Sequence, residues 1–360
     1  MPRKKPERNK NPTQPAGDYV LDPQERHDPS QQPLSEEEKA LVKRAYTLFD
    51  YFESKLRMQH MEMHDARAMR KLRHQERSGT SAVMNTLNSC IDNVIADQID
   101  NMPEARMAPE REETAQSAEE LTDVVSYILY HAGWPGKYQK IMEDVVVTGT
   151  GIAEVFWDDD AEDGDGMVNV IHWHPEDFYP DPMYEDIQDG RGVFKATQTT
   201  VAWVEEHYPH VRGYVQGSQR GAELEVSPTE APDGDVRTTV LEFWYKRYDA
   251  KKRKNRVHMA QLAGGALLFS TETGYGIEGG RKEYREGVYA HGQYPFTVYK
   301  YRDVFREPFG SGLIHDYKDT QLAIDRYQKY IDDNARESSV QRHFIRRGSG
   351  VNADDVADMR

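Results

Sequence analysis

The stretch Thr148-Gly149-Thr150-Gly151 divides this sequence into two parts that differ in the spacing of their apolar residues. Before it, apolar residues recur every three or four positions, which is typical of α-helices that bury one face. After it, short runs of β-branched and aromatic residues are separated by turn residues, which is typical of β-strands. A helical pattern returns near residue 311. The sequence therefore predicts an α+β fold with an N-terminal helical block, a mixed-β domain and a long helix at its end.

Four helices are predicted before the dividing stretch. The first begins after Ser35, because Ser35 and Glu38 have the spacing of a capping box, and its apolar pattern ends near residue 74. Cys90 lies on the apolar stripe of the second helix, so we expect a packed thiol there and not a nucleophile. The second, third and fourth helices are predicted at about residues 87–102, 118–129 and 137–147.

The β-rich part contains strand candidates and one short helix. The helix, residues 200–208, stops before Pro209, and residues 217–235 are expected to form a loop because they are rich in Gly, Pro and Glu. The pattern leaves open whether the strands form one sheet or two. The strand candidates are residues 153–157, 168–174, 193–199, 238–248, 256–262, 266–270 and 296–301.

The final helix, predicted at residues 311–339, has a narrow apolar stripe that is rich in tyrosine. A helix of that length would be a rod of roughly 40 Å at 1.5 Å per residue. Such a stripe suits a neighbouring helix better than a deep core. On the opposite face, Asp325/Lys329 and Asp332/Arg336 have the spacing of ion pairs along a helix. The stripe consists of Ile314, Tyr317, Gln321, Ile324, Tyr327, Ile331 and Ala335.

The composition excludes several classes of protein. Lys and Arg number 46 and Asp and Glu number 62, and the net charge of −16 excludes a generic, charge-driven nucleic-acid binder. The single cysteine excludes an intrachain disulfide framework and a four-cysteine zinc site. No apolar run approaches the roughly 20 residues that a membrane helix needs, so we expect no membrane partner. Residues 1–34 are rich in proline and lack apolar periodicity, so we expect a disordered arm.

The sequence contains no motif that carries catalysis. It has no Walker loop, no complete dinucleotide fingerprint, no Gly-x-Ser-x-Gly elbow and no helical His-Glu-x-x-His, so we expect neither enzyme activity nor a cofactor. The acidic segment 158–165 lacks the spacing of a calcium loop, and we interpret it as a hairpin tip. The basic segment 251–256 is also interpreted as a hairpin tip, and a salt-sensitive phosphate contact there stays open.

His172 and His174 lie on one face of a predicted strand, with Glu176 and Asp177 close behind. Two imidazoles and a carboxylate are a plausible set of ligands for a divalent metal. The sequence offers no clear third ligand and no general base, so we favour a structural or surface role. A metal-dependent hydrolase that uses His172, His174 and Asp177 is the alternative.

Several motifs occur in an order that is more informative than any one of them. His174-Pro175-Glu176-Asp177-Phe178-Tyr179-Pro180-Asp181-Pro182 follows the first strands, and Glu242-Phe243-Trp244-Tyr245 and Tyr294-Pro295-Phe296 lie in later ones. Pro308-Phe309-Gly310-Ser311-Gly312 leads into the final helix. In order and spacing, from about residue 35 to residue 360, these segments resemble the portal proteins of tailed bacteriophages.

The resemblance implies a ring, usually dodecameric, at one vertex of the phage capsid. DNA would be pumped through the ring by the terminase motor and would later leave by the same channel, with double-stranded DNA passing non-specifically. The implied partners are the terminase large subunit, the head–tail adaptor, and the major capsid and scaffolding proteins. The implied location is the virion, and the host cytoplasm during assembly.

The resemblance also implies a division of the chain. The second stem helix, the tunnel helix and the crown of the family are missing from this sequence, so we expect a portal protein that lacks its C-terminal part. The parts are residues 1–34 as the disordered arm, 35–150 as the helical part of the wing, 151–305 as the β-rich wing, 306–340 as the stem helix and 341–360 as the start of the clip.

Two sets of residues in the stem helix receive roles from the resemblance. Three basic residues would face the channel and touch DNA phosphates weakly, or would pair with the next subunit: Lys318, Lys329 and Arg336. Four residues would pack against a neighbouring subunit: Tyr317, Ile324, Tyr327 and Ile331. The alternative to a ring is a non-viral adaptor whose long helix docks on a partner helix.

Overall fold

The computed structural model describes residues 26–72, 86–109, 111, 115–159, 161, 164–218, 236–250, 252–277, 284 and 286–339. Within these ranges the chain forms the helices α1 (Glu36–Arg70), α3 (Thr86–Asp100), α4 (Ala115–His131), α5 (Trp134–Thr148), α6 (Val201–His207) and α7 (Leu313–Ser339). It also forms the strands β1 (Thr150–Asp158), β2 (Met167–Trp173), β3 (Phe178–Pro180), β4 (Gly192–Thr200), β5 (Arg237–Asp249), β6 (Lys254–Ala263), β7 (Ala266–Ser270) and β8 (Phe296–Lys300). The predicted α+β fold is confirmed, and each predicted helix and strand is present with ends shifted by a few residues.

The strands form two antiparallel sheets, which answers the question that the sequence left open. Sheet A has the order β2–β1–β8, and sheet B has the order β3–β4–β5–β6–β7. Sheet B connects neighbouring strands along the chain, whereas β8 returns from far away to pair with β1, with Thr150 opposite Lys300. β3 was not predicted, because a strand of three residues is too short to show an alternating pattern.

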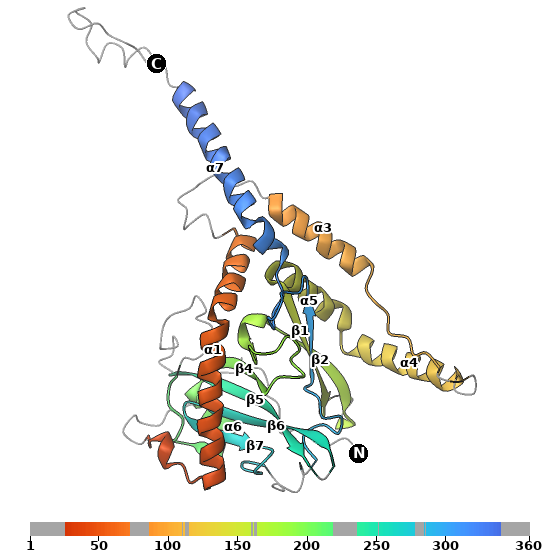
Figure 1. Ribbon diagram of the computed structural model, residues 1–360, viewed down its shortest axis with the longest axis vertical. Helices are drawn as coiled ribbons and strands as arrows, with labels where there is room; N and C mark the ends of the chain where they lie inside the picture. Colours follow the sequence, from red (N-terminus) through yellow and green to blue (C-terminus); the bar gives the residue numbers. More distant parts are fainter. Residues whose placement is uncertain are drawn as a thin grey trace, which may run out of the picture.

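Sheet B lies between α1 and sheet A. Successive side chains of a strand point to opposite faces, and the residues of β4 and β5 divide accordingly. Phe194 stacks on Phe243 and contacts Phe49 of α1, with ring centroids 4.3 Å and 5.3 Å away. The next residue, Lys195, points the other way and reaches Glu154 of β1 in sheet A. α1 runs along sheet B in Figure 1, so its apolar stripe is buried against the aromatic face.

The other face of sheet A is covered by α5. Ile141 and Val145 of α5 pack with Ala153 of β1 and Val170 of β2 in one buried cluster. α6 contributes to a separate buried cluster at one end of sheet B. The body therefore packs α1 on sheet B, sheet B on sheet A and α5 on the outer face of sheet A, and the C-terminal end of α1 reaches past sheet B to contact α5 through Arg67.

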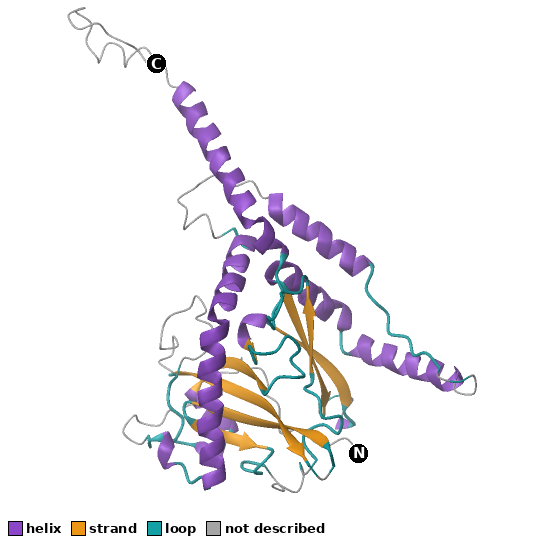
Figure 2. Ribbon diagram, viewed as in Figure 1, coloured by secondary structure: helices purple, strands orange, loops and turns teal. Residues whose placement is uncertain are grey.

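α7 begins in contact with α3 and α5 and then leaves the body. Ile314 of α7, Ile91 of α3 and Val146 of α5 belong to one buried cluster. Beyond this cluster α7 extends away from the two sheets, and α4 projects in a different direction (Figures 1 and 2). None of the described helices, α7 included, combines the length and the apolar character needed to cross a membrane.

The structure differs from the sequence predictions at two places. Cys90 is exposed, because the face of α3 centred on Ile91 takes the buried position and Cys90 lies at its flank. Residues 26–34, the end of the predicted arm, are ordered, because the buried amide of Gln32 pairs with both the N–H and the C=O of Leu267 in β7. Residues 1–25 of the arm, most of the predicted loop 217–235 and the predicted clip segment 341–360 lie outside the described residues.

Candidate functional site

Two glycine-rich stretches that are far apart in the sequence meet where α7 begins. Gly149, after α5, has a φ of 94°. A β-carbon on it would lie against the carbonyl oxygen of Gly310 and 2.5 Å from the amide nitrogen of Gly312, which is closer than real contacts allow. The N–H of Gly310 also donates to Oγ1 of Thr150 at 2.9 Å. Glycine is required here because main chain touches main chain, and this glycine joint (Gly149, Gly310 and Gly312) fixes the point where α7 leaves the body.

The body holds only the first half of α7. Ile314, Gln321 and Asp325 are its buried residues. Gln321 accepts a hydrogen bond from the N–H of Leu87 in α3 at 3.2 Å and donates to Asp325 at 2.8 Å. None of the described residues 326–339 is buried. The outer half of α7 therefore projects beyond the other residues that the structure describes (Figure 1).

The three predicted DNA contacts share one side of α7. At about 100° per residue, Lys318, Lys329 and Arg336 lie within roughly 20° of one another around the helix axis, along a line of about 27 Å. Lys318 and Lys329 are half-buried and Arg336 is exposed. Asp332 lies about 40° from this basic line on the same scale, so it balances part of the charge. The structure brings the three basic residues onto one edge of the helix.

The predicted interface residues lie on another side of α7. Tyr317, Tyr327 and Ile331 are 52%, 66% and 61% exposed, and Ile324 is half-buried. In the part of the chain that the structure describes, no element covers this apolar stripe. Exposed apolar faces of this kind are found on surfaces where proteins bind other molecules.

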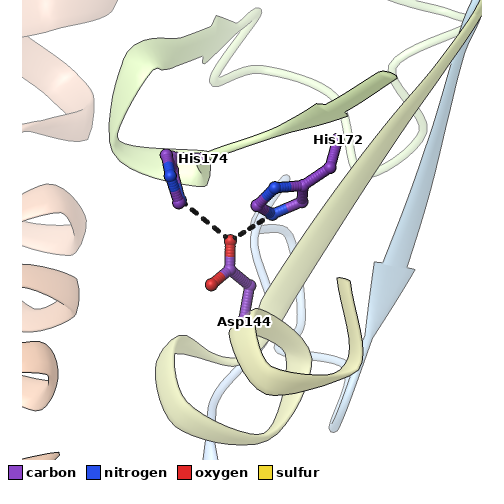
Figure 3. A group of neighbouring side chains, drawn as sticks. All are labelled: Asp144, His172 and His174. Atoms are coloured by element: carbon purple, nitrogen blue, oxygen red, sulfur yellow. Dashed lines mark hydrogen bonds and ion pairs between the residues drawn. The ribbon is translucent and has the colours of Figure 1, made fainter. Parts of the chain in front are cut away.

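A second candidate site lies where α1, α5 and β2 meet, and it contains both histidines that the sequence singled out. Nε2 of His172 lies 2.7 Å, and Nδ1 of His174 lies 3.2 Å, from the same oxygen, Oδ2 of Asp144 (Figure 3). Arg67 of α1 donates to the other oxygen, Oδ1, at 3.0 Å and pairs with Glu176 through two nitrogens. These five residues form a carboxylate–histidine cluster that ties three elements together.

Charges within this cluster shift the pKa values of its members. Burial alone would raise the pKa of Asp144, but hydrogen bonds from both histidines and from Arg67 outweigh it and hold that pKa far below its ordinary value. The hydrogen bond to Asp144 raises the pKa of His174. Asp177 is different, because burial and the adjacent charge of Glu176 raise its pKa to about 6.

Three of these side chains could together hold a metal ion. Asp144, His172 and His174 each offer one ligand atom, and the three atoms lie within 4.8 Å of one another. Asp177, which the hydrolase hypothesis used as third ligand, is not part of this group. Asp144 was not predicted as a ligand, because it lies 28 residues before His172 in the sequence. The available signal was a carboxylate inside the apolar run from Ile141 to Val147.

A second buried charged cluster joins the two sheets. Nζ of Lys195, which is 1% exposed, lies 3.0 Å from Oε2 of Glu154 and 2.6 Å from Oε1 of Glu242. The indole N–H groups of Trp173 and Trp244 donate to the same two carboxylates at 2.8 Å and 2.6 Å. Hydrogen bonds and ion pairs thus stabilise charges that would be costly alone. No sequence pattern predicted this cluster.

Both charged segments that the sequence singled out lie at hairpin tips, as predicted. β1 pairs with β2 as far as Asp158, and β5 pairs with β6 as far as Asp249. In the first tip, Asp159 accepts a hydrogen bond from the indole of Trp157 at 3.0 Å. In the second, Lys252 pairs with Glu286.

The family model for phage P22-like portal proteins matches residues 43–325. The chain belongs to the P22-like phage portal family. The match begins within α1 and ends within α7, so it includes both sheets, the glycine joint and the carboxylate–histidine cluster. Portal proteins are structural components of the virion capsid, and this membership confirms the resemblance found in the sequence. No match was found among curated proteins.

Proposed function

We propose that this portal protein is the subunit of a dodecameric ring at one vertex of the capsid, and that the ring is the channel for packaging and ejection of the genome. Family membership supports a portal role. The observation that carries the ring is the exposed apolar stripe of α7, with Tyr327 and Ile331 more than half exposed in one copy. In a cyclic ring each copy covers the stripe of its neighbour, and cyclic symmetry leaves none uncovered.

The basic line of α7 supports passage of duplex DNA. Lys318, Lys329 and Arg336 are spaced along one edge, so they can touch separate phosphates along the duplex without reading bases. Three contacts per copy on a protein with a net charge of −16 give weak, salt-sensitive binding. A channel that must let DNA slide benefits from weak contacts. The same residues can instead pair with acids of the neighbouring copy.

The remaining parts of the chain have roles in the proposed assembly. Residues 35–305 form the wing, which contacts the capsid shell and neighbouring copies, and residues 306–340 form the stem. Residues 341–360 begin the clip, where the terminase large subunit and later the head–tail adaptor dock. The ring assembles in the host cytoplasm with scaffolding and major capsid proteins, and the terminase motor hydrolyses the ATP.

The test is the assembly state of the full chain and of stripe variants. Native mass spectrometry at two salt concentrations and negative-stain images would be recorded for the protein and for the double variant Tyr327→Glu/Ile331→Glu. We expect rings for the protein and single copies for the variant, because two buried carboxylates per interface are costly. The matched control is Tyr248→Glu, because Tyr248 has the same exposed fraction as Tyr327, 66%, but lies in sheet B.

One result would contradict the ring, and a second would contradict the stripe as its interface. The first is a protein that stays monomeric at every concentration, which would favour the adaptor hypothesis and direct the search to a partner helix. The second is a stripe variant that assembles as well as Tyr248→Glu. Loss of rings in both variants would show that the loss is not specific to the stripe.

A further inference from the structure

Three possible ligand atoms in the carboxylate–histidine cluster lie within 4.8 Å of one another. Oδ2 of Asp144 lies 2.7 Å from Nε2 of His172 and 3.2 Å from Nδ1 of His174 (Figure 3). The three residues come from α5, from β2 and from the turn that follows β2. We propose that Asp144, His172 and His174 form a binding site for a divalent transition-metal ion, with Zn²⁺ as the ion of best fit.

The surroundings of His174 favour a cation over a hydrogen-bonded cluster alone. Its Nδ1 lies 3.2 Å from a carboxylate oxygen of Asp144, which only accepts, and 3.3 Å from Nη2 of Arg67, which only donates. If Nδ1 carries a proton, its N–H faces the N–H group of the guanidinium. If Nδ1 carries no proton, its lone pair faces the lone pairs of the carboxylate oxygen. A metal ion between Oδ2 and the two ring nitrogens removes the second conflict, because all three atoms then offer lone pairs to the same cation.

The ligand set selects the class of metal. Two imidazole nitrogens and one carboxylate oxygen suit Zn²⁺ and its first-row neighbours, whereas Mg²⁺ and Ca²⁺ prefer oxygen ligands throughout. Bonds of about 2.0–2.1 Å in tetrahedral geometry place ligand atoms about 3.3 Å apart. The His174 contact, 3.2 Å, already has this spacing, and the His172 contact, 2.7 Å, needs to open by about half an ångström.

Arg67 is a positioning residue for this site. It donates to Oδ1 of Asp144 and pairs with Glu176, so Oδ2 is turned toward the histidines. An outer partner of this kind fixes the orientation of a ligating carboxylate. With neutral imidazoles, one guanidinium faces the two carboxylates of Asp144 and Glu176, so the cluster has a net negative charge that favours a cation.

Burial gives the site one closed side and one open side. The side chains of Asp144 and His172 are 3% and 10% exposed, whereas that of His174 is 58% exposed. An ion can therefore enter beside His174, and water can complete its coordination. Such an ion would link the end of α5 to sheet A, five residues before Gly149 in the glycine joint.

The experiment measures metal binding by the untagged full chain after treatment with a chelator. Calorimetric titration with ZnCl₂ gives stoichiometry, the shift in Tm gives stabilisation, and Co²⁺ in place of Zn²⁺ gives a visible absorption band that reports nitrogen ligands. MgCl₂ and CaCl₂ serve as hard-cation comparisons. The test variant is His174→Ala, which removes an exposed side chain, and His172→Ala and Asp144→Asn extend it to the buried ligands.

The matched control is His315→Ala. Nδ1 of His315 lies 3.9 Å from a carboxylate oxygen of Glu62 and both side chains are half exposed, so this pair has one imidazole and one carboxylate but no third ligand. We expect one Zn²⁺ per chain, a rise in Tm, and binding unchanged in the control. In His174→Ala we expect affinity to fall by more than the roughly 10–100-fold that loss of an outer partner costs.

Three results would overturn the site. They are the absence of Zn²⁺ and Co²⁺ binding by the protein, equal binding by the protein and His174→Ala, and a Tm shift that Mg²⁺ produces as strongly as Zn²⁺. If His172→Ala does not fold, His174→Ala decides, because its unliganded Tm and circular dichroism can be compared directly with those of the protein. None of these results depends on ring formation.

Discussion

The two-sheet body and the outer helices of this portal protein use their apolar residues differently. In the body, Phe49, Phe194 and Trp244 have no exposed surface. In the outer helices, Ile331 of α7 and Tyr130 of α4 are 61% and 79% exposed. The body completes its core from its own chain, whereas α4 and the outer half of α7 leave apolar surface uncovered by any described residue. In a single copy the core of the body is therefore buried, whereas apolar side chains of α4 and the outer half of α7 are exposed.

The two regions also differ in what their charges do. The body buries Lys195 with Glu154 and Glu242, and each of these buried charges is stabilised by its ion pair with the opposite charge. On the outer half of α7, Lys329 is half-buried and Arg336 is exposed to solvent. The comparison predicts that substitutions in the body change stability, whereas substitutions on the outer helices change assembly.

The largest effect is expected for Lys195→Ala. Removing the cation leaves two buried carboxylates close together, and breaking a buried pair costs about 3–5 kcal/mol. Urea unfolding followed by circular dichroism measures the loss. Lys39→Ala is the control, because Lys39 pairs with Glu36 at the surface, where such a pair contributes about 0–1 kcal/mol. Equal losses in the free energy of unfolding of the two variants would show that the buried ion pairs of Lys195 contribute no more to stability than a surface pair.

Gly149→Ala should lower the free energy of unfolding by about 3 kcal/mol, because backbone strain at positive φ adds to a clash with Gly310 and Gly312. Gly133→Ala is the matched control. Gly133 also has a positive φ, 65°, but a β-carbon there meets no atom within 4 Å. We expect about 1 kcal/mol for the control. Similar losses would show that the close approach at the glycine joint contributes nothing.

The pH dependence of stability should depend on His60, which is buried in α1 against Tyr179 and Phe309. Burial lowers its pKa from 6.5 to about 4. The folded state then binds fewer protons than the unfolded state between these values, so stability falls as the pH is lowered through this window. From pH 7.5 to pH 5 we expect this group to remove about 2 kcal/mol.

His60→Gln should lack this part of the slope when urea unfolding is compared at the two pH values. Asp177, with its pKa raised to about 6, contributes with the opposite sign, since a raised carboxyl pKa adds stability as the pH falls. That contribution is common to both proteins and cancels in the comparison. An unchanged slope in His60→Gln would refute the assignment.

The smallest effect on stability is expected for Tyr327→Glu/Ile331→Glu. Both side chains are exposed in a single copy, so the free energy of unfolding of the isolated copy should change by less than about 0.5 kcal/mol. The measurement is urea unfolding under conditions in which the protein is monomeric. A loss of several kcal/mol would show that the outer half of α7 belongs to the body after all.

Much of the fold could be predicted because its signals are local. The capping box at Ser35 places the start of α1, and alternation and turn residues place the strands. The third strand of sheet A could not be placed, because β8 pairs with β1 across more than a hundred residues and no local pattern encodes that partner. Cys90 was misjudged because a stripe on a helix does not show where the buried face ends.

The candidate sites divide in the same way. The stripe and the basic line of α7 follow from helical spacing alone, and the structure shows where they lie without testing their roles. The carboxylate–histidine cluster needed coordinates, since Asp144 joins His172 and His174 only through the packing of α5 on sheet A. The pairing of Lys195 with Glu154 of sheet A could not be predicted from the sequence either.

The glycine joint has a mechanical consequence. α7 has 27 residues and is about 40 Å long, so it is a lever, and a tilt of about 5° at its base moves its tip by roughly 3 Å. A pivot made of side chains changes angle when a rotamer changes. This pivot is main chain packed on main chain, which has no rotamers. This main-chain contact, together with the buried side chains of Ile314, Gln321 and Asp325, therefore sets the direction in which α7 leaves the body.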